Sequence, residues 1–502
     1  MTQNFARKTW SFELFFKNYI VGTLLFALLS VPACAKNIEE EPPHEILRHL
    51  MVDGKPFLML GAQLRTDFFL QLDKKTPEEL SEYFELAAKM NILVVQVPIS
   101  WKDVEPLKDQ YAGDLIEKYI ELCDRYQMKL ELLWFGSYMC GYSVEGYIPD
   151  YVVYNTSTYP ELKPSASFQG WLGKHYYLKP NTQALVEREE KAIKYMMDVI
   201  YKYDNNHGKK HTVIGIQVEN EPDMLATRHN QAHGYQPEQL WPDLIRMLDR
   251  LGQAVKNSNY DCYTRVNQTN TYRDYIERSA EIAATAGIDY VGVDPYQNGI
   301  NQIGDVLWKL QNIKGNYAHI AENGGEYANN DILTLKALTM GCGYEIFEVI
   351  TTPHPYLVDW TLRGVWNPDF TPKSHTQQIV DAYKIFKDAW VDLATAETQN
   401  IVGFNMQQND GQQQVVENRK TTNVQIKWQT ENRGIAFAVE YNGYLTVAST
   451  KSDVMEFSGA QISGIEKGWY DLDRKWIPNG NVTLDNYQLI MEPCVVYRMK
   501  IE

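Results

Sequence analysis

Short apolar runs alternate with amphipathic stretches along most of this 502-residue chain, from about residue 46 to residue 397. Runs such as Ile92-Leu-Val-Val-Gln-Val97 are rich in β-branched residues, as in strands that are buried on both faces. The stretch at 77–90 places Leu80 and Phe84 at helical spacing. Strands that alternate with helices form a parallel sheet, so this pattern predicts an α/β fold.

The number of strand–helix units narrows the fold further. Eight units follow one another, which fits a closed (β/α)8 barrel of roughly 350 residues. The strands are expected at residues 56–61, 92–97, 129–134, 213–218, 262–267, 290–294, 317–321 and 343–347. We therefore expect a TIM barrel at residues 40–397.

The composition and the apolar pattern of the sequence change beyond residue 397. A Gln- and Asn-rich stretch is followed by short alternating runs at 434–439 and 444–448, with Asn442-Gly443 between them. Asn-Gly between two strands is typical of a tight β-hairpin. These are hairpin signals without helices, so residues 398–502 are expected to form a small C-terminal all-β sandwich domain.

The N-terminus has the order of an export signal. Basic residues come first, then an apolar run at 19–29, then small residues up to Cys34. The apolar run is too short to span a bilayer comfortably. Val31-Pro-Ala-Cys34 resembles a bacterial lipobox, which would anchor the protein to a membrane through a lipid on Cys34; conventional cleavage at Ala33-Cys-Ala35 is the alternative. We expect residues 1–35 to direct export to the periplasm or the cell surface.

Charge and metal-binding residues argue against several classes of partner. The formal net charge of −16 leaves no basic stripe that would bind phosphates, which argues against a nucleic-acid partner. Histidine pairs such as His207 and His211 lack the carboxylate spacing of a zinc site. The cysteines after Cys34 include no Cys-X-X-Cys pair, and most are expected to be buried apolar thiols. We expect no metal and no cofactor.

Loops that follow barrel strands share one open face, where side chains meet a bound molecule. Two acids stand directly after expected strands, Glu221 after the fourth and Glu322 after the seventh. These strands lie on roughly opposite sides of an eight-strand ring, so both carboxyl groups can reach the same bond. The expected substrate contacts around them are Arg65, Trp101, Trp134, Asn220, Asn267, Tyr296 and Trp366.

The fourth strand carries the most specific motif. Gln217-Val-Glu-Asn-Glu221 resembles the motif at this place in glycoside hydrolase family 35 β-galactosidases, and Asn-Glu here is shared by the wider clan A of retaining glycosidases, including families 5 and 42. Residues 54–61 and 132–136 also resemble the family 35 and 42 group, and the resemblance covers most of 46–373. It implies a TIM barrel in which Glu221 is the acid/base and Glu322 the nucleophile.

The residues support the same chemistry. A retaining mechanism needs one carboxylic acid that protonates the leaving oxygen and one carboxylate that attacks the anomeric carbon, about 5 to 5.5 Å apart. Burial and a second carboxylate would raise the pKa of Glu221, and hydrogen bonds would keep Glu322 ionised. Tyr296 is expected to donate to Glu322, and Asn220 to bind the sugar 2-hydroxyl.

Neighbouring residues leave other assignments open. Glu219 alternates with Glu221 and is a rival acid, and Glu326 is a rival nucleophile four residues beyond Glu322. The Asn-Glu-Pro sequence is also compatible with a plain turn and helix cap. The tryptophans are as well suited to barrel packing as to stacking on sugar rings. The tyrosine-rich segment 137–180 is expected to wall the cleft.

The leading hypothesis is an exported, β-galactosidase-like retaining glycoside hydrolase whose partner is an oligo- or polysaccharide. The first alternative is a family 5-like endo-β-glycanase acting on glucan or mannan; a closed pocket favours the former and an open groove the latter. The second alternative is a barrel that binds glycan without catalysis.

Overall fold

The structure is a computed structural model of the chain. It describes residues 49–71, 73–162, 168–170, 173–226, 237–270, 274–352, 363–406, 414–485 and 487–502. The expected export signal at 1–35 lies outside the described residues. The barrel and the C-terminal sheets both belong to one compact unit, His44–Glu502.

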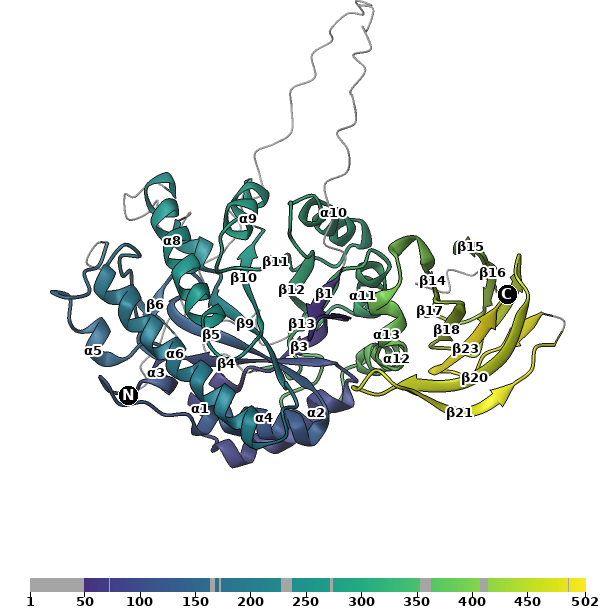
Figure 1. The fold of residues 1–502 in the computed structure, drawn as a ribbon, viewed down its shortest axis with the longest axis horizontal. Helices are drawn as coiled ribbons and strands as arrows, with labels where there is room; N and C mark the ends of the chain where they lie inside the picture. The colour runs from purple at the N-terminus through teal and green to yellow at the C-terminus, as the bar shows by residue number, and fades with distance from the viewer. Residues whose placement is uncertain are drawn as a thin grey trace, which may run out of the picture. The chain divides into compact units, whose positions relative to one another are not determined.

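Eight parallel strands close into a barrel, in which the last strand pairs with the first (Figure 1). They are β3 (Leu60–Gln63), β4 (Val94–Ser100), β5 (Lys129–Met139), β9 (Val213–Asn220), β10 (Tyr263–Thr269), β11 (Tyr290–Asp294), β12 (His319–Gly324) and β13 (Gly343–Phe347). The predicted TIM barrel is confirmed. The first strand differs from its expected range, because residues 55–57 pair with β1 (Leu50–Val52) as β2 (Lys55–Phe57) and the barrel begins at Leu60.

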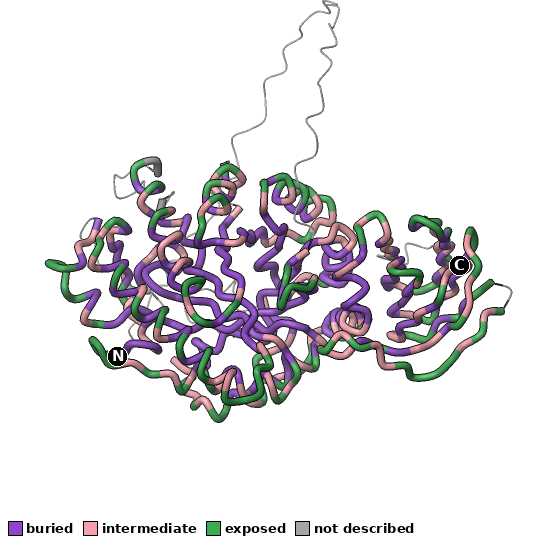
Figure 2. The backbone as a smooth tube through the Cα atoms, in the orientation of Figure 1, coloured by how far each residue is buried: buried purple, intermediate pink, exposed green. Residues whose placement is uncertain are grey.

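Helices flank the barrel, and the buried residues gather inside this layer (Figure 2). The longer ones are α2 (Ser81–Lys89), α4 (Asp114–Tyr126), α6 (Gln183–Asn206), α8 (Pro237–Lys256), α9 (Tyr275–Ala283), α10 (Ile300–Gln311), α11 (Asn330–Thr339) and α12 (Thr376–Asp388). In α4, Ile116, Tyr119 and Cys123 are spaced along one buried face. The helix ends at Gln127, whose left-handed backbone (φ 54°) turns its N–H back onto the last turn.

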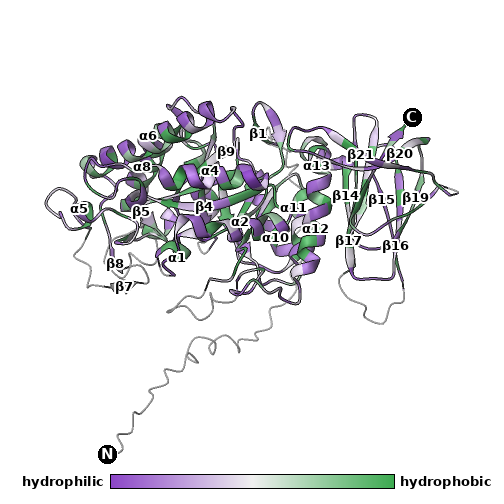
Figure 3. Cartoon of the chain, turned by 90° about the horizontal axis from the view of Figure 1, so that it is seen from below, coloured by the Kyte–Doolittle hydropathy of each residue, from purple (hydrophilic) through white to green (hydrophobic). Residues whose placement is uncertain are grey.

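Two antiparallel sheets form the C-terminal region, as the sequence predicts. One sheet contains β14 (Ile401–Met406), β17 (Gly434–Tyr441), β18 (Tyr444–Ser449), β23 (Val495–Ile501), β20 (Ile462–Tyr470) and β21 (Trp476–Val482); the other contains β15 (Val415–Lys420), β16 (Gln425–Thr430), β19 (Val454–Ser458) and β22 (Gln488–Ile490). Hydrophilic and hydrophobic residues are interspersed along these strands (Figure 3). Apolar residues of both sheets share one core, where Phe404 packs on Trp428.

The predicted hairpin at Asn442-Gly443 joins β17 to β18. Both turn residues have positive φ, 49° for Asn442 and 75° for Gly443, as a type I′ turn requires. Tyr441 and Tyr444 are the last pair of the ladder before the turn.

Buried polar contacts connect the barrel helices to the sandwich. Asp392 on α13 (Trp390–Thr395) accepts hydrogen bonds from Thr446 Oγ1 at 2.6 Å and from Tyr470 Oη at 2.9 Å. Arg433 binds both carboxylate oxygens of Asp331 on α11, at 2.8 and 3.0 Å. The sandwich therefore buttresses the barrel through its outer helices. None of the described helices is both long and apolar enough to cross a bilayer.

One cation occupies the interior of the barrel. Arg265 on β10 is 1% exposed and binds Glu131 of β5 through Nε at 2.6 Å and Nη2 at 3.0 Å. Its Nη1 donates to Gln217 of β9 at 2.6 Å, and Nη2 lies 3.3 Å from Glu345 of β13. Gln96 of β4 donates to both carboxylates. Four strands of the ring therefore meet at the guanidinium group, and β4 joins the same polar cluster through Gln96.

The charges in this cluster nearly cancel. Burial and the neighbouring charge of Glu131 raise the pKa of Glu345 well above its usual range, which favours its neutral form. Glu131 and Arg265 form one buried ion pair, and the amides of Gln96 and Gln217 add hydrogen bonds to its two charged groups. Such a pair strongly destabilises a protein when one partner is removed.

Replacing Arg265 by methionine is expected to lower the free energy of unfolding by about 3–5 kcal/mol, because Glu131 remains buried without its partner. Guanidinium chloride unfolding followed by circular dichroism measures the change. Arg246 on α8 is the control, since its side chain is 67% exposed and its replacement should matter by less than about 0.5 kcal/mol. An Arg265→Met protein as stable as the wild type would contradict this role.

Candidate active site

Glu221 stands at the C-terminal end of β9, where the strand breaks off sharply. All eight residues of β9 are buried. The backbone is left-handed at Glu219 (φ 62°) and again at Glu221 (φ 44°), which is uncommon for non-glycine residues and typical of functional sites. The N–H of Glu221 donates to Asn267 Oδ1 at 3.0 Å, so β10 fixes this turn.

The carboxyl group of Glu221 is nearly enclosed. The residue is 7% exposed, and its Oε2 accepts a hydrogen bond from the thiol of Cys140 at 3.0 Å. Burial and the charge of Glu322 raise the pKa of Glu221 to about 8, although the thiol acts in the opposite direction. Glu221 is therefore mainly protonated at neutral pH, as a general acid must be.

Glu322 lies on β12 where the pairing with β13 shifts register, between Ile320 and Asn323. Such a bulge changes the direction of the side chains it contains. Tyr296 Oη donates to Glu322 Oε2 at 2.5 Å, and Gln63 Nε2 donates to Oε1 at 3.1 Å. Both carboxylate oxygens are thus held by donors, and the predicted contact with Tyr296 is present.

A third acid and two amides form the floor between β9, β10 and β11. Asn267 Nδ2 donates to Asn220 Oδ1 at 3.1 Å and to Asp294 Oδ2 at 2.7 Å. Burial and the charges of Glu322 and Glu221 raise the pKa of Asp294 well above its usual range. Asn267 was expected to contact substrate, but its amide hydrogens and its oxygen are engaged within the protein. Asn267 holds the backbone N–H of Glu221, and its contact with substrate stays a prediction.

Two of the predicted sugar platforms, Trp101 and Trp134, are fully buried. Trp101 and Trp134 are both 0% exposed, so neither ring offers a face to a ligand. Their indole N–H groups donate to buried acids, Trp101 to Glu105 at 3.1 Å and Trp134 to Glu189 at 2.7 Å. Both rings pack the barrel, because a partner for the indole nitrogen makes full burial favourable. Trp366 is partly exposed, bridges Ile350 and Pro372, and stays a prediction.

Arg65 lies near the site in a closed cluster. It is 4% exposed, and its guanidinium binds both oxygens of Asp67, at 2.9 and 2.6 Å. Tyr147 donates to the same carboxylate at 2.6 Å. This geometry makes Arg65 an anchor for the loop after β3, and its contact with substrate stays a prediction.

The rival acids have other surroundings. Glu219 is fully buried and accepts backbone N–H groups of Gly136, Ser137 and Tyr138 at 3.2, 2.9 and 2.8 Å, so it holds the end of β5. Glu326 lines a cavity of about 1090 Å³ where the barrel meets the sandwich, and neither Glu221 nor Glu322 lines it. Glu219 is thus paired with the buried Glu189 beside the end of β5, and Glu326 lines a different cavity.

Sequence patterns missed one residue at the site. Cys140 was expected to be a buried apolar thiol like the other cysteines, yet it contacts Glu221. The strand β5 runs on to Met139, five residues beyond its expected end at Trp134, and Met139 pairs with Asn220. No pattern in the sequence predicts that this strand continues beyond Trp134. The segment beyond it contains β6 (Ser143–Val144), β7 (Phe168–Gly170) and β8 (Gly173–Tyr176), which form a small sheet.

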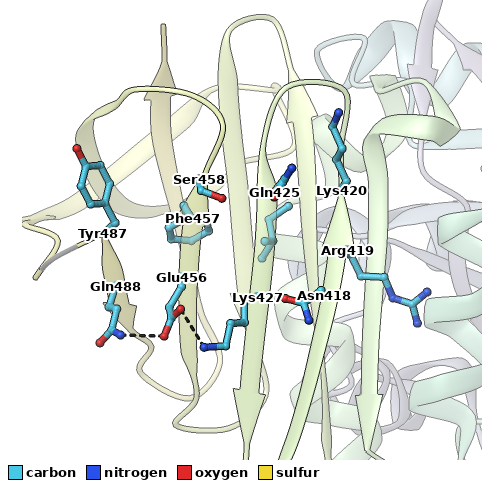
Figure 4. Close-up of a pocket in the computed structure, with 11 residues that line it drawn as sticks. Asn418, Arg419, Lys420, Gln425, Lys427, Glu456, Phe457, Ser458, Tyr487 and Gln488 are labelled. Atoms are coloured by element: carbon cyan, nitrogen blue, oxygen red, sulfur yellow. Dashed lines mark hydrogen bonds and ion pairs between the residues drawn. The ribbon is translucent and has the colours of Figure 1, made fainter.

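A second concave surface lies on the sandwich, where β15, β16 and β19 border a groove of about 480 Å³ (Figure 4). Two of its charged groups bind each other, since Lys427 Nζ lies 3.0 Å from Glu456, and the amide of Gln488 donates to the same carboxylate at 2.8 Å. The groove contains no facing carboxyl pair, so the barrel mouth is the candidate active site. Within the described ranges, no cluster of His, Cys, Asp and Glu is suited to hold a metal ion.

A family described as a domain of unknown function (DUF4978) matches residues 244–412. No curated protein matches the chain.

Solved structures similar to this chain include several glycoside hydrolases. An exo-β-1,4-mannosidase from an Opitutaceae bacterium is 12% identical, with a TM-score of 0.48, over 67% of this chain and 61% of that protein. A β-galactosidase from the haloarchaeon Halorubrum lacusprofundi is 13% identical, with a TM-score of 0.49, over 66% and 58%. A family 39 glycoside hydrolase from Bacteroides cellulosilyticus is 12% identical, with a TM-score of 0.43, over 89% and 83%. This chain thus spans about three fifths of the first two, and the similarity does not single out family 35 or 42.

Replacing Glu221 by glutamine is expected to stabilise the protein in a pH-dependent way. Below about pH 4 the carboxyl group is neutral in both the folded and the unfolded state, so the variant and the wild type should melt together. As pH rises, the unfolded state ionises first, because the pKa in the folded state is about 8, and the wild type loses stability relative to the variant. Each pKa unit corresponds to about 1.4 kcal/mol.

Thermal melts between pH 4 and pH 9 measure this difference, which should reach its maximum above pH 8. Glu82, an exposed residue of α2, gives the matched Glu→Gln control and should show no such trend. A Glu221→Gln protein that melts with the wild type at pH 8 would rule out a buried neutral acid.

Proposed function

We propose that this protein hydrolyses O-glycosidic bonds of an oligo- or polysaccharide by double displacement, with Glu221 as acid/base and Glu322 as nucleophile. One observation carries the proposal: burial and the charge of Glu322 raise the pKa of Glu221 at the mouth of the barrel, which favours its protonated form. Two hydrogen-bond donors hold the carboxylate of Glu322 in place. Barrels of this kind place catalytic groups on this face. The strand motif at 217–221 supports the same assignment.

The residues divide the reaction into two steps. In the first, a carboxylate oxygen of Glu322 attacks the anomeric carbon while Glu221 gives its proton to the leaving oxygen, and a covalent glycosyl-enzyme forms. In the second, the Glu221 carboxylate takes a proton from water, the water oxygen attacks the anomeric carbon, and Glu322 leaves. The configuration at the anomeric carbon is retained.

Three polar neighbours support these steps. Tyr296 and Gln63 orient the attacking oxygens of Glu322. Asn220 is held through Oδ1, which accepts from Gln217 and Asn267, so its Nδ2 is directed to the site and is proposed to bind the sugar 2-hydroxyl. A β-galactoside is the first proposed substrate, from the motif resemblance, and β-glucosides and β-mannosides test the endo-glycanase alternative. Export, with a lipid on Cys34, is part of the same proposal.

Alanine variants of the two acids are expected to fail in different ways. Glu221→Ala should lower kcat/KM on aryl glycosides with poor leaving groups by roughly 10²- to 10⁴-fold. Azide should rescue it and give a glycosyl azide of retained configuration, because the glycosyl-enzyme still forms. Azide should also rescue Glu322→Ala, but the product should be a glycosyl azide of inverted configuration, because azide attacks directly and no covalent intermediate forms.

Product configuration by NMR and peptide mapping after a 2-fluoro glycoside inactivator check both roles, and Glu82→Gln serves as the control. Hydrolysis by either alanine variant at the wild-type rate, or a label on another residue, would overturn the assignment. Glycan binding without turnover by the wild type would support the non-catalytic barrel instead.

The pH dependence should report Glu221 directly. The acid form is needed in the first step, so kcat/KM should fall as pH rises through about 8, the pKa of Glu221. The fall should disappear for Glu221→Gln on dinitrophenyl glycosides, whose leaving group needs no proton. Initial rates from pH 5 to pH 10 measure both profiles, and an upper limb that persists in the Gln variant would assign it to another group.

A further inference from the structure

The thiol of Cys140 is part of a short hydrogen-bonded chain that ends on the proposed acid/base. Cys140 Sγ lies 3.0 Å from Glu221 Oε2, and Asn220 Nδ2 lies 3.7 Å from the same sulfur. Cys140 is half-buried and unpaired with any other cysteine. Both neighbours of the sulfur belong to the motif at the end of β9, so the thiol contacts the reacting residues themselves.

Backbone contacts hold the thiol at this place. The N–H of Cys140 donates to the carbonyl oxygen of Asn220 at 2.8 Å, which extends the pairing of β5 with β9 beyond the barrel rim. Cys140 (φ 53°) and Gly141 (φ 74°) then turn the chain through two left-handed residues. A Cβ atom at Gly141 would lie 2.3 Å from the nitrogen of Leu225, so this turn packs closely on the 3₁₀ helix η2 (Pro222–Ala226) that follows Glu221.

The thiol is suited to donate and not to ionise. Burial and the charge of Glu221 raise the pKa of Cys140 well above its usual range, so the sulfur keeps its proton. An S–H group that donates to Glu221 stabilises the ionised carboxylate, which opposes the effect of burial on the pKa of Glu221. The other groups that act on Glu221 are Glu322, Tyr296, Asp223, Asp294 and Arg363.

We propose that Cys140 is a positioning residue for the acid/base: its S–H group holds Oε2 of Glu221, so that Oε1 is the oxygen that gives and takes the proton. This inference rests on the proposed function. In the first step the proton leaves Oε1 for the glycosidic oxygen, and the charge that appears on Glu221 is stabilised by the thiol. In the second step Oε1 takes the proton of water and the thiol contact persists.

Three variants test the role. Cys140→Ala removes the donor, Cys140→Ser restores a shorter one, and Cys262→Ala is the control. Cys262 is also half-buried but precedes β10, at the opposite end of the barrel from Glu221. Rates on glycosides with leaving groups of increasing acidity, each measured from pH 5 to pH 10, give the readout.

Cys140→Ala is expected to lower kcat/KM about 5- to 10-fold on poor leaving groups and by less than about twofold on dinitrophenyl glycosides, because only the former need the proton. Its upper pH limb should move up by about half a unit to one unit, since the ionised form of Glu221 loses a donor. Cys140→Ser should return towards the wild-type profile, and Cys262→Ala should coincide with it.

The positioning role would be overturned if the pH profile of kcat/KM were unchanged in Cys140→Ala. It would also be overturned if kcat/KM fell equally on all leaving groups with no shift of the pH profile, which would leave Cys140 a packing role only. A readout without turnover separates this failure from that of the proposed function. The stability gained by Glu221→Gln at pH 8 should be larger in the Cys140→Ala background than in the wild type. If that stability gain is larger but the protein hydrolyses no glycoside, the contact between Cys140 and Glu221 is supported and its role in acid/base catalysis is overturned.

Discussion

The buried ion pair of Arg265 is the constraint on which the barrel and its site depend. The guanidinium joins Glu131 and Glu345 on strands that lie on both sides of β10 in the ring. Side chains alternate along a strand, so Arg265 and Asn267 point to the same side of β10. The register that the ion pair sets therefore also places Asn267, which holds the backbone of Glu221. A slip of one residue would remove both contacts at once.

The left-handed residues at the end of β9 show how this rigidity is used. Glu219 and Glu221 adopt a conformation that non-glycine residues rarely choose. The surroundings impose it, because Glu219 binds three consecutive N–H groups of residues 136–138 and Asn267 binds the N–H of Glu221. Strain of this kind persists only where neighbouring contacts determine the backbone. Its effect is to direct one glutamate into the wall and the next one into the mouth of the barrel.

Local patterns in the sequence were sufficient to predict the barrel and the places of Glu221 and Glu322, because each acid follows an apolar run and the runs alternate with helices. They were not sufficient where a side chain finds its partner far along the chain. Trp134 donates to Glu189, 55 residues later, and is fully buried. Cys140 reaches Glu221 only because β5 continues past its expected end. Cross-strand partners and strand lengths depend on the closed ring, which no local window contains.

Opposing effects on Glu221 explain why one residue can serve both halves of the proposed reaction. Burial and the charge of Glu322 favour the protonated form, whereas the Cys140 thiol and the Arg363 guanidinium favour the ionised form. The balance leaves a pKa of about 8, close to neutral pH. A group that must give a proton and later take one works best when its pKa lies near the working pH. Burial without an opposing donor would make Glu221 too weak an acid to release its proton. Exposure would lower its pKa, so that it would carry no proton to give.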